Sequence, residues 1–328
     1  MDAAAVSRLL SPAAAADALA AVLREGLDPE AAPPRTAVPV PAGELLLMPA
    51  ASAAWAGVKV AGVAPGNPAR GLARITGSYL LLDGPSLCPV AVLDGAALTA
   101  LRTPAVSALA IRLLVGPGRP VRRLLLFGAG PQAYGHLAAV CAEREVAEVV
   151  VVARDPGRAA GPAAYARDLG VPKARTGTVA DVPDADLVVC CTTARTPLFD
   201  GRLVAPGATV VAVGSHEPDA RETDTELVRR SAVYVELRAA AAREAGDLLI
   251  PEAEGAIGPG HAAGTLADLV TGRVAPPDTA VPRLFKSVGM AWEDLAVAVA
   301  VHEAARAAGL GGTDAARTLG LTGLTGET

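Results

Sequence analysis

The stretch that decides the fold reads Val121-Arg122-Arg123-Leu124-Leu125-Leu126-Phe127, followed at once by Gly128-Ala129-Gly130-Pro131-Gln132-Ala133. The short apolar run predicts a buried strand, and the residues after the glycines predict a helix. Between them, small residues would let a pyrophosphate approach backbone N–H groups at the helix start. This order predicts a dinucleotide-binding loop with Gly128, Gly130, Pro131 and Ala133 at the cofactor; the alternative is an ordinary glycine-rich turn.

Further apolar runs alternate with helical segments along the chain after this loop. They are Val149–Ala153, Leu187–Cys191, Val210–Val213 and Val233–Leu237. Short, nearly continuous apolar runs are typical of parallel strands that are covered on both faces. We therefore predict an α/β, Rossmann-type doubly wound domain over residues 118–284, which begins at the breaker cluster Gly116-Pro117-Gly118.

The region before this domain has a different pattern. Ser11 and Pro12 predict a capped helix that runs to Arg24 and stops at Gly26. Short apolar runs between Pro and Gly clusters then predict mostly antiparallel strands at Leu45–Met48, Val58–Val63, Tyr79–Leu82 and Val90–Leu93, and helical spacing returns over Leu98–Val115. We expect residues 1–117 to form the first part of an α+β domain.

The last part of the chain, Val281 to Gly309, has a long alanine-rich helical pattern. Its simplest place is against the N-terminal sheet, so we assign residues 285–328 to the same α+β domain, into which the Rossmann domain is inserted. A chain of 328 residues suits two domains. We expect the tail beyond Gly311 to be mobile.

Charge and histidine spacing exclude several classes of partner. The chain has 29 basic and 34 acidic residues, a net charge of −5 and no long block of one sign, which argues against nucleic acid and membrane surfaces. His136, His261 and His302 lack metal-like spacing, so we expect structural roles for them and no metal. A small molecule is the expected partner.

Cysteine usage and the N-terminus favour the cytoplasm. The four cysteines (Cys88, Cys141, Cys190 and Cys191) are few for the length, and Cys190 and Cys191 lie in an apolar run, which predicts buried, reduced thiols. The N-terminus lacks the basic start and uninterrupted apolar segment of a signal peptide. No run approaches the ~20 apolar residues that a bilayer requires, so we expect no membrane span.

The end of the second strand of the Rossmann domain indicates the choice of cofactor. An acidic residue there would bind the ribose 2′-hydroxyl of NAD(H) and repel a 2′-phosphate. The expected position is Ala153, and Arg154 follows it, which favours NADPH. A register shift of two residues would make Asp155 the ribose ligand and favour NADH instead.

Seven stretches together resemble the ornithine cyclodeaminase/mu-crystallin family. They are Pro34-Arg35-Thr36, Gly57-Val58-Lys59-Val60, Pro65-Gly66-Asn67-Pro68-Ala69-Arg70-Gly71, Leu98-Thr99-Ala100-Leu101-Arg102-Thr103, the Gly128–Ala133 loop, Val213-Gly214-Ser215 and Phe285-Lys286-Ser287-Val288-Gly289. They occur in the family's order and cover about residues 34 to 300.

The resemblance implies a homodimer that associates through its sheet domain, and a small amino or imino acid substrate bound between the domains. The family's carboxylate-binding roles fall on Arg35, Lys59 and Arg102, and we add Val288 as a substrate contact. A planar guanidinium can bind a carboxylate through two parallel hydrogen bonds. The alternative is that Arg35 and Lys59 are surface or snorkelling cations.

The resemblance also implies cofactor contacts outside the glycine loop. They fall on Thr103, Gln132, Arg154, Thr192, Val213 and Ser287. Thr192 follows a predicted strand, at the usual edge of a nucleotide cleft, although a hydroxyl there is often only a cap.

The sequence departs from the cyclodeaminase pattern after Val213-Gly214. Cyclodeaminases and related alanine dehydrogenases carry an aspartate two residues on, where this chain has His216. Reduction of an imine requires positioning and one proton source, which His216, with an ordinary pKa of ~6.5, could supply or relay. The alternative is that His216 only hydrogen-bonds the nicotinamide or the loop. We take Lys59 and His216 as the candidate catalytic residues.

Three functions follow as hypotheses. The first is NADPH-dependent reduction of a cyclic or linear ketimino acid, of the pyrroline- or piperideine-2-carboxylate type, to an amino acid. The second is an NAD-dependent amino-acid dehydrogenase or an ornithine or lysine cyclodeaminase, which would release ammonia. The third is a nucleotide-bound binding protein with little turnover, against which the three cations argue.

Overall fold

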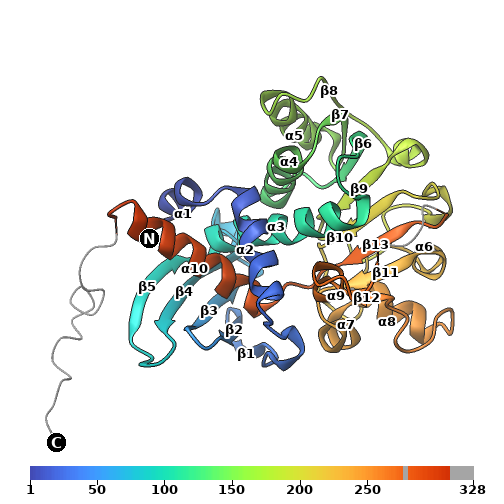
Figure 1. Cartoon of the computed structure of the whole chain (residues 1–328). Helices are drawn as coiled ribbons and strands as arrows, with labels where there is room; N and C mark the ends of the chain where they lie inside the picture. The colour runs from blue at the N-terminus through green and yellow to red at the C-terminus, as the bar shows by residue number, and fades with distance from the viewer. Residues whose placement is uncertain (276–279, 311–328) are drawn as a thin grey trace, which may run out of the picture. The chain divides into compact units, whose positions relative to one another are not determined.

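The computed structural model describes residues 1–275 and 280–310 (Figure 1). They form two compact units. The sheet unit comprises Met1–Val22, Ala31–Arg102 and the described chain from Met290; the Rossmann unit comprises Leu23–Glu30 and Thr103–Gly289. The division into domains at 1–117, 118–284 and 285–328 remains a prediction.

The sheet unit is built on five antiparallel strands in the order β1-β2-β3-β4-β5. The last four contain the four predicted apolar runs, whereas β1 was not predicted. The strands are β1 (Thr36–Val40), β2 (Gly43–Ala51), β3 (Trp55–Val63), β4 (Ile75–Asp83) and β5 (Pro89–Asp94). Helices α1 (Ala3–Leu9) and α10 (Ala291–Ala307) lie wholly in this unit. Helix α2 (Pro12–Arg24) lies in it up to Val22. Helix α10 packs against β2, β3 and β4, so the predicted return of the C-terminal helix to the sheet is confirmed.

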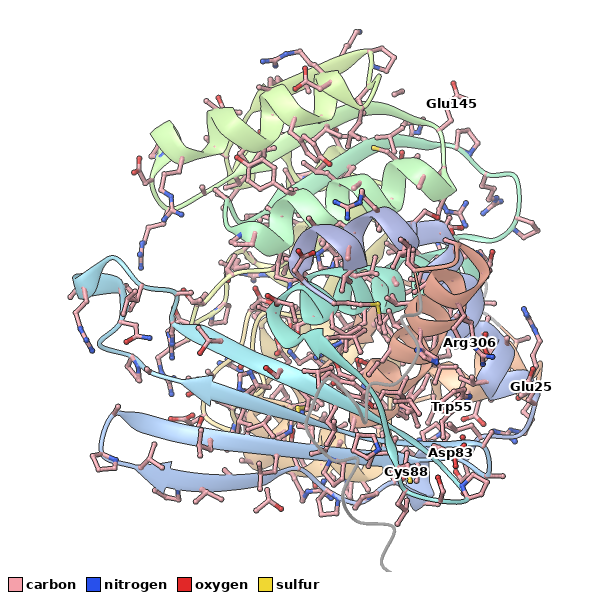
Figure 2. The ribbon with its side chains drawn as sticks, turned by 90° about the vertical axis from the view of Figure 1, so that its left-hand side faces the viewer. Glu25, Trp55, Asp83, Cys88, Glu145 and Arg306 are labelled. Carbon is pink, nitrogen blue, oxygen red and sulfur yellow. The ribbon has the colours of Figure 1, made fainter. Side chains whose placement is uncertain are left out.

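One face of this sheet is buried and the other is exposed, because alternate side chains of a strand point to opposite faces. Figure 2 shows the strands with their side chains, with Trp55, Asp83 and Cys88 at one end of the sheet. The outer sheet face carries Val38, Leu45, Val60 and Val92, each 37–40% exposed. It is an apolar surface on an otherwise charged protein.

The Rossmann unit contains eight parallel strands in the order β12-β11-β13-β10-β9-β6-β7-β8, so the predicted α/β doubly wound fold is confirmed. They are β6 (Val121–Phe127), β7 (Val146–Val152), β8 (Lys173–Thr176), β9 (Leu187–Cys190), β10 (Thr209–Ala212), β11 (Ala232–Val235), β12 (Gly264–Thr265) and β13 (Arg283–Lys286). The helices are α4 (Pro131–Glu143), α5 (Pro156–Asp168), α6 (Thr225–Arg230), α7 (Arg238–Glu244), α8 (Gly246–Ala253) and α9 (Leu266–Val270). Short 3-10 helices occur at Pro29–Ala31, Pro68–Arg70, Val179–Asp184 and Gly201–Leu203.

The prediction of one helical segment from Val281 to Gly309 is wrong at its beginning. Residues Arg283–Lys286 form β13, which lies between β10 and β11 in the middle of the sheet. All four residues are buried, because both faces of this strand are covered. A buried run of four residues is too short to show a period, so the alanine-rich sequence after it dominated the pattern. The tail beyond Gly311 lies outside the described residues.

The expectation that no apolar run reaches membrane-spanning length also needs correction. Helix α3 (Gly95–Val115) has 21 residues, and its most apolar window has a mean hydropathy of 1.5. The bent pair α1 and α2 passes the same test when it is counted as one span. Buried core helices pass the test as well, and 61% of the α3 window is buried, so this is weak evidence for a span.

Candidate functional site

Two cations and two carboxylates form one buried cluster in the sheet unit. Lys59 Nζ donates to Asp294 Oδ2 at 2.7 Å. Arg102 donates from Nε to Asp294 Oδ1 at 3.2 Å and from Nη1 to Glu293 Oε2 at 2.7 Å. None of the four residues is more than 6% exposed. The two positive and two negative charges balance, which offsets part of the cost of burying them.

Three separate elements bring these side chains together. Lys59 is on the buried face of β3, and Arg102 is in the first half of α3. Glu293 and Asp294 lie in the first turn of α10, where the helix dipole favours negative charge, and Glu293 also accepts from the backbone N–H of Met290 at 3.1 Å. The structure therefore brings together two of the three predicted carboxylate-binding cations.

Burial lowers the pKa of Lys59 to about 8; the charge of Asp294 opposes this shift and that of Arg102 adds to it. The ammonium group is thus mostly protonated at neutral pH but gives up its proton far more readily than an exposed lysine does. Its other contact is weak, a 3.4 Å hydrogen bond to the hydroxyl of Thr99. Lys59 has the properties of a proton donor near neutral pH.

Arg35, the third predicted cation, lies immediately before β1 at the edge of the same sheet. Thr36 pairs with Leu47, so Arg35 stands level with Met48, which itself pairs with Lys59. Two strand spacings of about 4.8 Å therefore separate the backbones of Arg35 and Lys59. A long arginine side chain can cover part of that distance.

The glycine loop of the Rossmann unit has the geometry of a phosphate site. Gly128 has φ of +131°, and a Cβ there would approach the carbonyl oxygen of Cys191 to 2.8 Å. Gly130 caps α4, and Pro131 is the first residue of that helix. Among the described residues, nothing bonds the buried Oε1 of Gln132. The bare helix N-terminus fits the pyrophosphate of a dinucleotide, whereas the unpaired Gln132 Oε1 is an acceptor and suits a donor group rather than a phosphate oxygen.

The end of β7 leaves a basic side chain exposed. The strand ends at Val152, so Ala153 and Arg154 follow it, and Arg154 is exposed. Asp155 caps α5, with its Oδ1 accepting from Gly157 N–H at 3.0 Å. This capping bond gives Asp155 a structural role.

A buried glutamate that the sequence analysis did not single out joins the ends of β9 and β10. Glu222 accepts from the backbone N–H of Thr192, the hydroxyl of Thr192 and the N–H of Gly214, each at 2.7 Å. The hydroxyl of Thr192 therefore donates its hydrogen bond to Glu222. A Cβ at Gly214 would collide with the Glu222 carboxylate and the Thr192 carbonyl, so only glycine fits there.

An ion pair lies behind this glutamate. Asp247 accepts from the backbone N–H groups of Glu222 and Thr223 at 2.9 and 2.8 Å, and Lys286 Nζ lies 2.9 Å from its other oxygen. Lys286 also donates to the carbonyl of Ser215 at 2.7 Å. Burial raises the pKa of Glu222; for Asp247, Lys286 and the hydrogen bonds outweigh burial and lower the pKa.

Glu236 holds the segment that follows β13. Its carboxylate accepts from the Ser287 hydroxyl at 2.6 Å and from the N–H groups of Val288 and Gly289 at 2.8 and 2.9 Å. The hydroxyl proton of Ser287 is thus engaged in the hydrogen bond to Glu236. The sequence offered one signal for this residue, a glutamate directly after the apolar strand β11.

The remaining predicted residues lie at the same edge of the Rossmann sheet or in its helices. His216 is exposed on the loop after β10, and Val213 donates its N–H to Cys190 at 2.9 Å. Thr103 is buried in α3. His136 is fully buried between the Gln132 carbonyl and the Ser107 hydroxyl, and burial lowers its pKa to about 4. Among residues 1–275 and 280–310, no three His, Cys, Asp or Glu side chains are placed to hold a metal.

Comparison with known proteins gives the family. The model of the ornithine cyclodeaminase/mu-crystallin family matches residues 2–309. The chain belongs to this family. It is 36% identical over 275 residues to the ketimine reductase mu-crystallin of Mus musculus. The aligned residues cover 83% of this chain and 84% of the mouse protein.

Two solved structures of this fold extend the comparison. The Δ1-pyrroline-2-carboxylate reductase of Thermococcus litoralis, solved with NADH and L-proline, has a TM-score of 0.88 and 31% identity, covering 96% of this chain and 99% of that one. An archaeal alanine dehydrogenase dimer with bound NAD has a TM-score of 0.87 and 26% identity, covering 94% and 96%.

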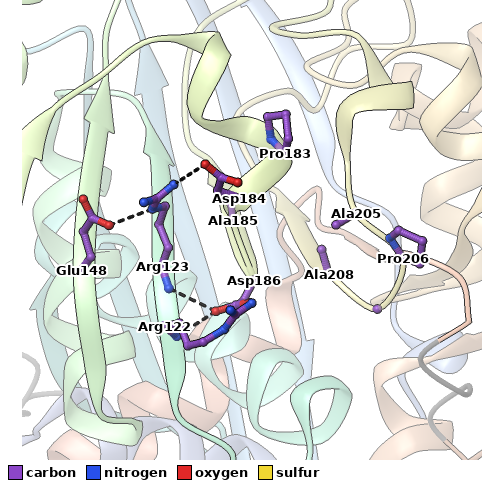
Figure 3. Close-up of a pocket in the computed structure, with 11 residues that line it drawn as sticks. Arg122, Arg123, Glu148, Pro183, Asp184, Ala185, Asp186, Ala205, Pro206 and Ala208 are labelled. Carbon is purple, nitrogen blue, oxygen red and sulfur yellow. Dashed lines mark hydrogen bonds and ion pairs between the residues drawn. The ribbon is translucent and has the colours of Figure 1, made fainter.

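In the present protein, a pocket lies at the end of the Rossmann sheet where β6, β9 and β10 begin, opposite the end that carries the glycine loop (Figure 3). Arg123 binds Glu148 at 2.8 Å and Asp184 at 2.9 Å, while Arg122 binds Asp186 at 2.6 Å. Both arginines are thus already paired with carboxylates, and open α/β sheets bind ligands at the carboxyl ends of their strands. We assign no chemistry to this pocket.

Proposed function

We propose that this protein reduces a small cyclic or linear ketimino acid, of the pyrroline- or piperideine-2-carboxylate type, to the amino acid at the expense of NAD(P)H. The observation that carries the proposal is the buried Lys59 and Arg102 cluster, which offers a carboxylate-binding cation beside a titratable ammonium group. A nicotinamide, when bound, would supply hydride to the C=N carbon. The protein has to hold the substrate and manage one proton.

The site residues take the following roles in this proposal. Arg35, Lys59 and Arg102 hold the substrate carboxylate, with Val288 as an apolar contact. Lys59 provides the proton for the imine or amine nitrogen, because its pKa of about 8 lies close to working pH. His216 is the second candidate to donate or relay a proton, since its exposed position leaves it able to exchange with water.

The cofactor would be held by the glycine loop, Gly128 to Ala133 with Gln132, and by the ends of the neighbouring strands. Thr103, Arg154, Thr192, Val213 and Ser287 complete the proposed set. The hydroxyls of Thr192 and Ser287 donate to buried glutamates, so their contribution to the cofactor would be as acceptors or through shape.

We propose NADPH as the preferred cofactor, with NADH as the alternative. Arg154 is exposed beside Ala153, and Asp155 is engaged as a helix cap, which favours a 2′-phosphate over a 2′-hydroxyl at this corner. The Thermococcus litoralis reductase was solved with NADH, which supports NADH as the alternative.

Replacing Arg154 with alanine tests this choice. We expect kcat/KM for NADPH to fall roughly 10- to 100-fold, because a charge-assisted hydrogen bond to phosphate contributes about 1.5–3 kcal/mol. The value for NADH should change by less than threefold. Arg229→Ala, at an exposed pair with Glu226 on α6, is the control and should change neither. An equal loss with both cofactors would rule out a 2′-phosphate contact at Arg154.

We further propose a cytoplasmic homodimer that binds neither nucleic acid nor membrane. The apolar outer sheet face supports association, because soluble monomers rarely leave such a face open. The archaeal relative in the comparison is itself a dimer. All four cysteines are free thiols in the structure, which suits the cytoplasm, but Cys88 is exposed and not buried as predicted.

Val60→Glu tests the dimer by placing a charge in the outer sheet face. We expect light scattering of the wild type to give twice the chain mass and that of Val60→Glu to give the chain mass, because burying an unpaired carboxylate is costly. Val179→Glu, at an equally exposed valine of the Rossmann unit, is the control and should stay dimeric. A wild-type protein that is monomeric at micromolar concentration would contradict the proposal.

The second candidate function is an NAD-dependent amino-acid dehydrogenase or cyclodeaminase, favoured by the 0.87 TM-score to an alanine dehydrogenase. His216 at the position of the expected aspartate argues against it. The test of the first function is direct: the protein is incubated with NADPH or NADH and with Δ1-pyrroline- or Δ1-piperideine-2-carboxylate, and proline or pipecolate is sought by mass spectrometry. Formation of either amino acid supports reduction, and the absence of both products with both cofactors would reject it.

A further inference from the structure

The hydroxyl of Tyr79 is a buried hydrogen-bond donor without a partner among the described residues. Tyr79 is 0% exposed, so water in bulk does not reach it. Buried tyrosine hydroxyls normally find a partner, because leaving one unpaired destabilises the fold. An exception of this kind needs an explanation.

Tyr79 lies directly beside Lys59. The sheet register pairs Met48 with Lys59, Lys59 with Tyr79, and Tyr79 with Leu93, so the four side chains form one row across the buried face. Directly opposed residues on antiparallel strands have Cβ atoms about 5 Å apart. Tyr79 is therefore the cross-strand neighbour of Lys59, and Asp294 is near enough for its charge to raise the pKa of the phenol.

The ring of Tyr79 lies over Gly57, two residues from Lys59 on the same face of β3. A Cβ at Gly57 would overlap the Tyr79 hydroxyl and lie 2.7 Å from ring atom Cζ. Covering a glycine with a neighbouring aromatic ring is a known way to stabilise a sheet. Phenylalanine would do this equally well, so sheet stability accounts for the ring and leaves the hydroxyl unexplained.

The neighbouring polar groups are already engaged with one another. Lys59 and Arg102 donate to Asp294 and Glu293, and the Thr99 hydroxyl donates to the carbonyl of Gly95 at 2.8 Å. Burial, together with the charge of Asp294, raises the pKa of Tyr79, so the phenol stays protonated at working pH and can act only as a neutral donor or acceptor.

We propose that Tyr79 is a substrate-binding residue whose hydroxyl donates a hydrogen bond to the carboxylate of the ligand held at Lys59 and Arg102. This inference rests on the proposed assignment of that cluster to the substrate. Tyr79 then adds a neutral donor to the cations, and the unpaired hydroxyl of the free protein gains its partner when the ligand binds. Ligands that lack a carboxylate leave the hydroxyl unpaired and are selected against.

Tyr79→Phe separates this role from a purely structural one. Titration of the cofactor-loaded dimer with L-proline should show a Kd roughly 10-fold higher for the variant than for the wild type. The Tm of the free protein should stay the same or rise, because the variant loses only an unpaired hydroxyl. Affinity for pyrrolidine, which lacks the carboxylate, should not change.

Tyr234→Phe is the matched control. Tyr234 is equally buried, on β11, but its hydroxyl donates to the carbonyl of Ala275 at 3.4 Å. This variant should lower the Tm and leave L-proline affinity unchanged. Gly57→Ala is the second variant; its Cβ displaces the Tyr79 hydroxyl, so it should weaken L-proline binding as Tyr79→Phe does.

The outcomes that overturn the inference are distinct from those that overturn the proposed reaction. Unchanged L-proline affinity in Tyr79→Phe, or a Tm loss as in Tyr234→Phe, would make Tyr79 a core residue only. So would a wild type that binds none of L-proline, L-pipecolate and L-alanine. A protein that binds L-proline through Tyr79 but oxidises neither NADPH nor NADH with any imino acid would reject the reaction and keep the inference.

Discussion

Replacing Lys59 with methionine is expected to lower kcat/KM for imino-acid reduction by about 10³-fold, the usual contribution of a positioned general acid. The variant keeps the packing of the side chain but loses the proton and one carboxylate contact. Arg102 still binds both Asp294 and Glu293, so the cluster keeps part of its structure. The measurement is the initial rate of reduced-cofactor oxidation across substrate concentrations.

The pH dependence of activity shows whether Lys59 donates the proton in imino-acid reduction. Because its pKa is lowered to about 8, activity should be present below pH 8 and fall as the pH rises through that value. Lys59→Arg keeps the charge but cannot lose its proton, so its residual activity should lack this basic limb. Lys173→Met, at the exposed first residue of β8, should behave as wild type. A wild-type profile that stays flat to pH 10 would contradict the assignment.

Replacing Asp247 with alanine is expected to lower the free energy of unfolding by about 3–5 kcal/mol, as breaking one side of a buried ion pair does. Asp247 and Lys286 are both fully buried, and the change leaves Lys286 without its carboxylate partner. It also leaves the N–H groups of Glu222 and Thr223 without an acceptor. Denaturant unfolding monitored by circular dichroism measures the loss.

A double-mutant cycle isolates the ion pair from the backbone contacts. Asp247→Leu combined with Lys286→Met should be less destabilising than the sum of the two single changes, because no unpaired charge is left. Arg202→Ala, at an exposed pair with Asp200, is the control and should leave the unfolding midpoint unchanged. Additive effects of the two single changes would show that the pair contributes no coupling.

The fold followed from the sequence where local pattern and buried surface agree. The glycine loop between β6 and α4 was predicted because glycine and proline have specific backbone roles there. The strand β13 was missed because its neighbours in the sheet, β10 and β11, are far from it in the chain. Nothing local distinguishes four buried residues before a long helix.

The candidate site was predicted only in part. Lys59 and Arg102 came from the family resemblance, while Glu293 and Asp294 lay in a helical pattern where acids usually face solvent. Two adjacent acids after Ala291 and Trp292, at the start of an apolar helix, were the available signal. Glu222 and Glu236 were missed because most of their partners are backbone N–H groups, which a sequence does not display.

The most direct test of the proposed reaction follows absorbance at 340 nm while the dimer is mixed with NADPH or NADH and a panel of cyclic and linear imino acids. We expect rapid loss of absorbance with NADPH and Δ1-pyrroline- or Δ1-piperideine-2-carboxylate, and slower loss with NADH. No loss with any imino acid, together with NAD-dependent release of ammonia from ornithine, lysine or alanine, would contradict it.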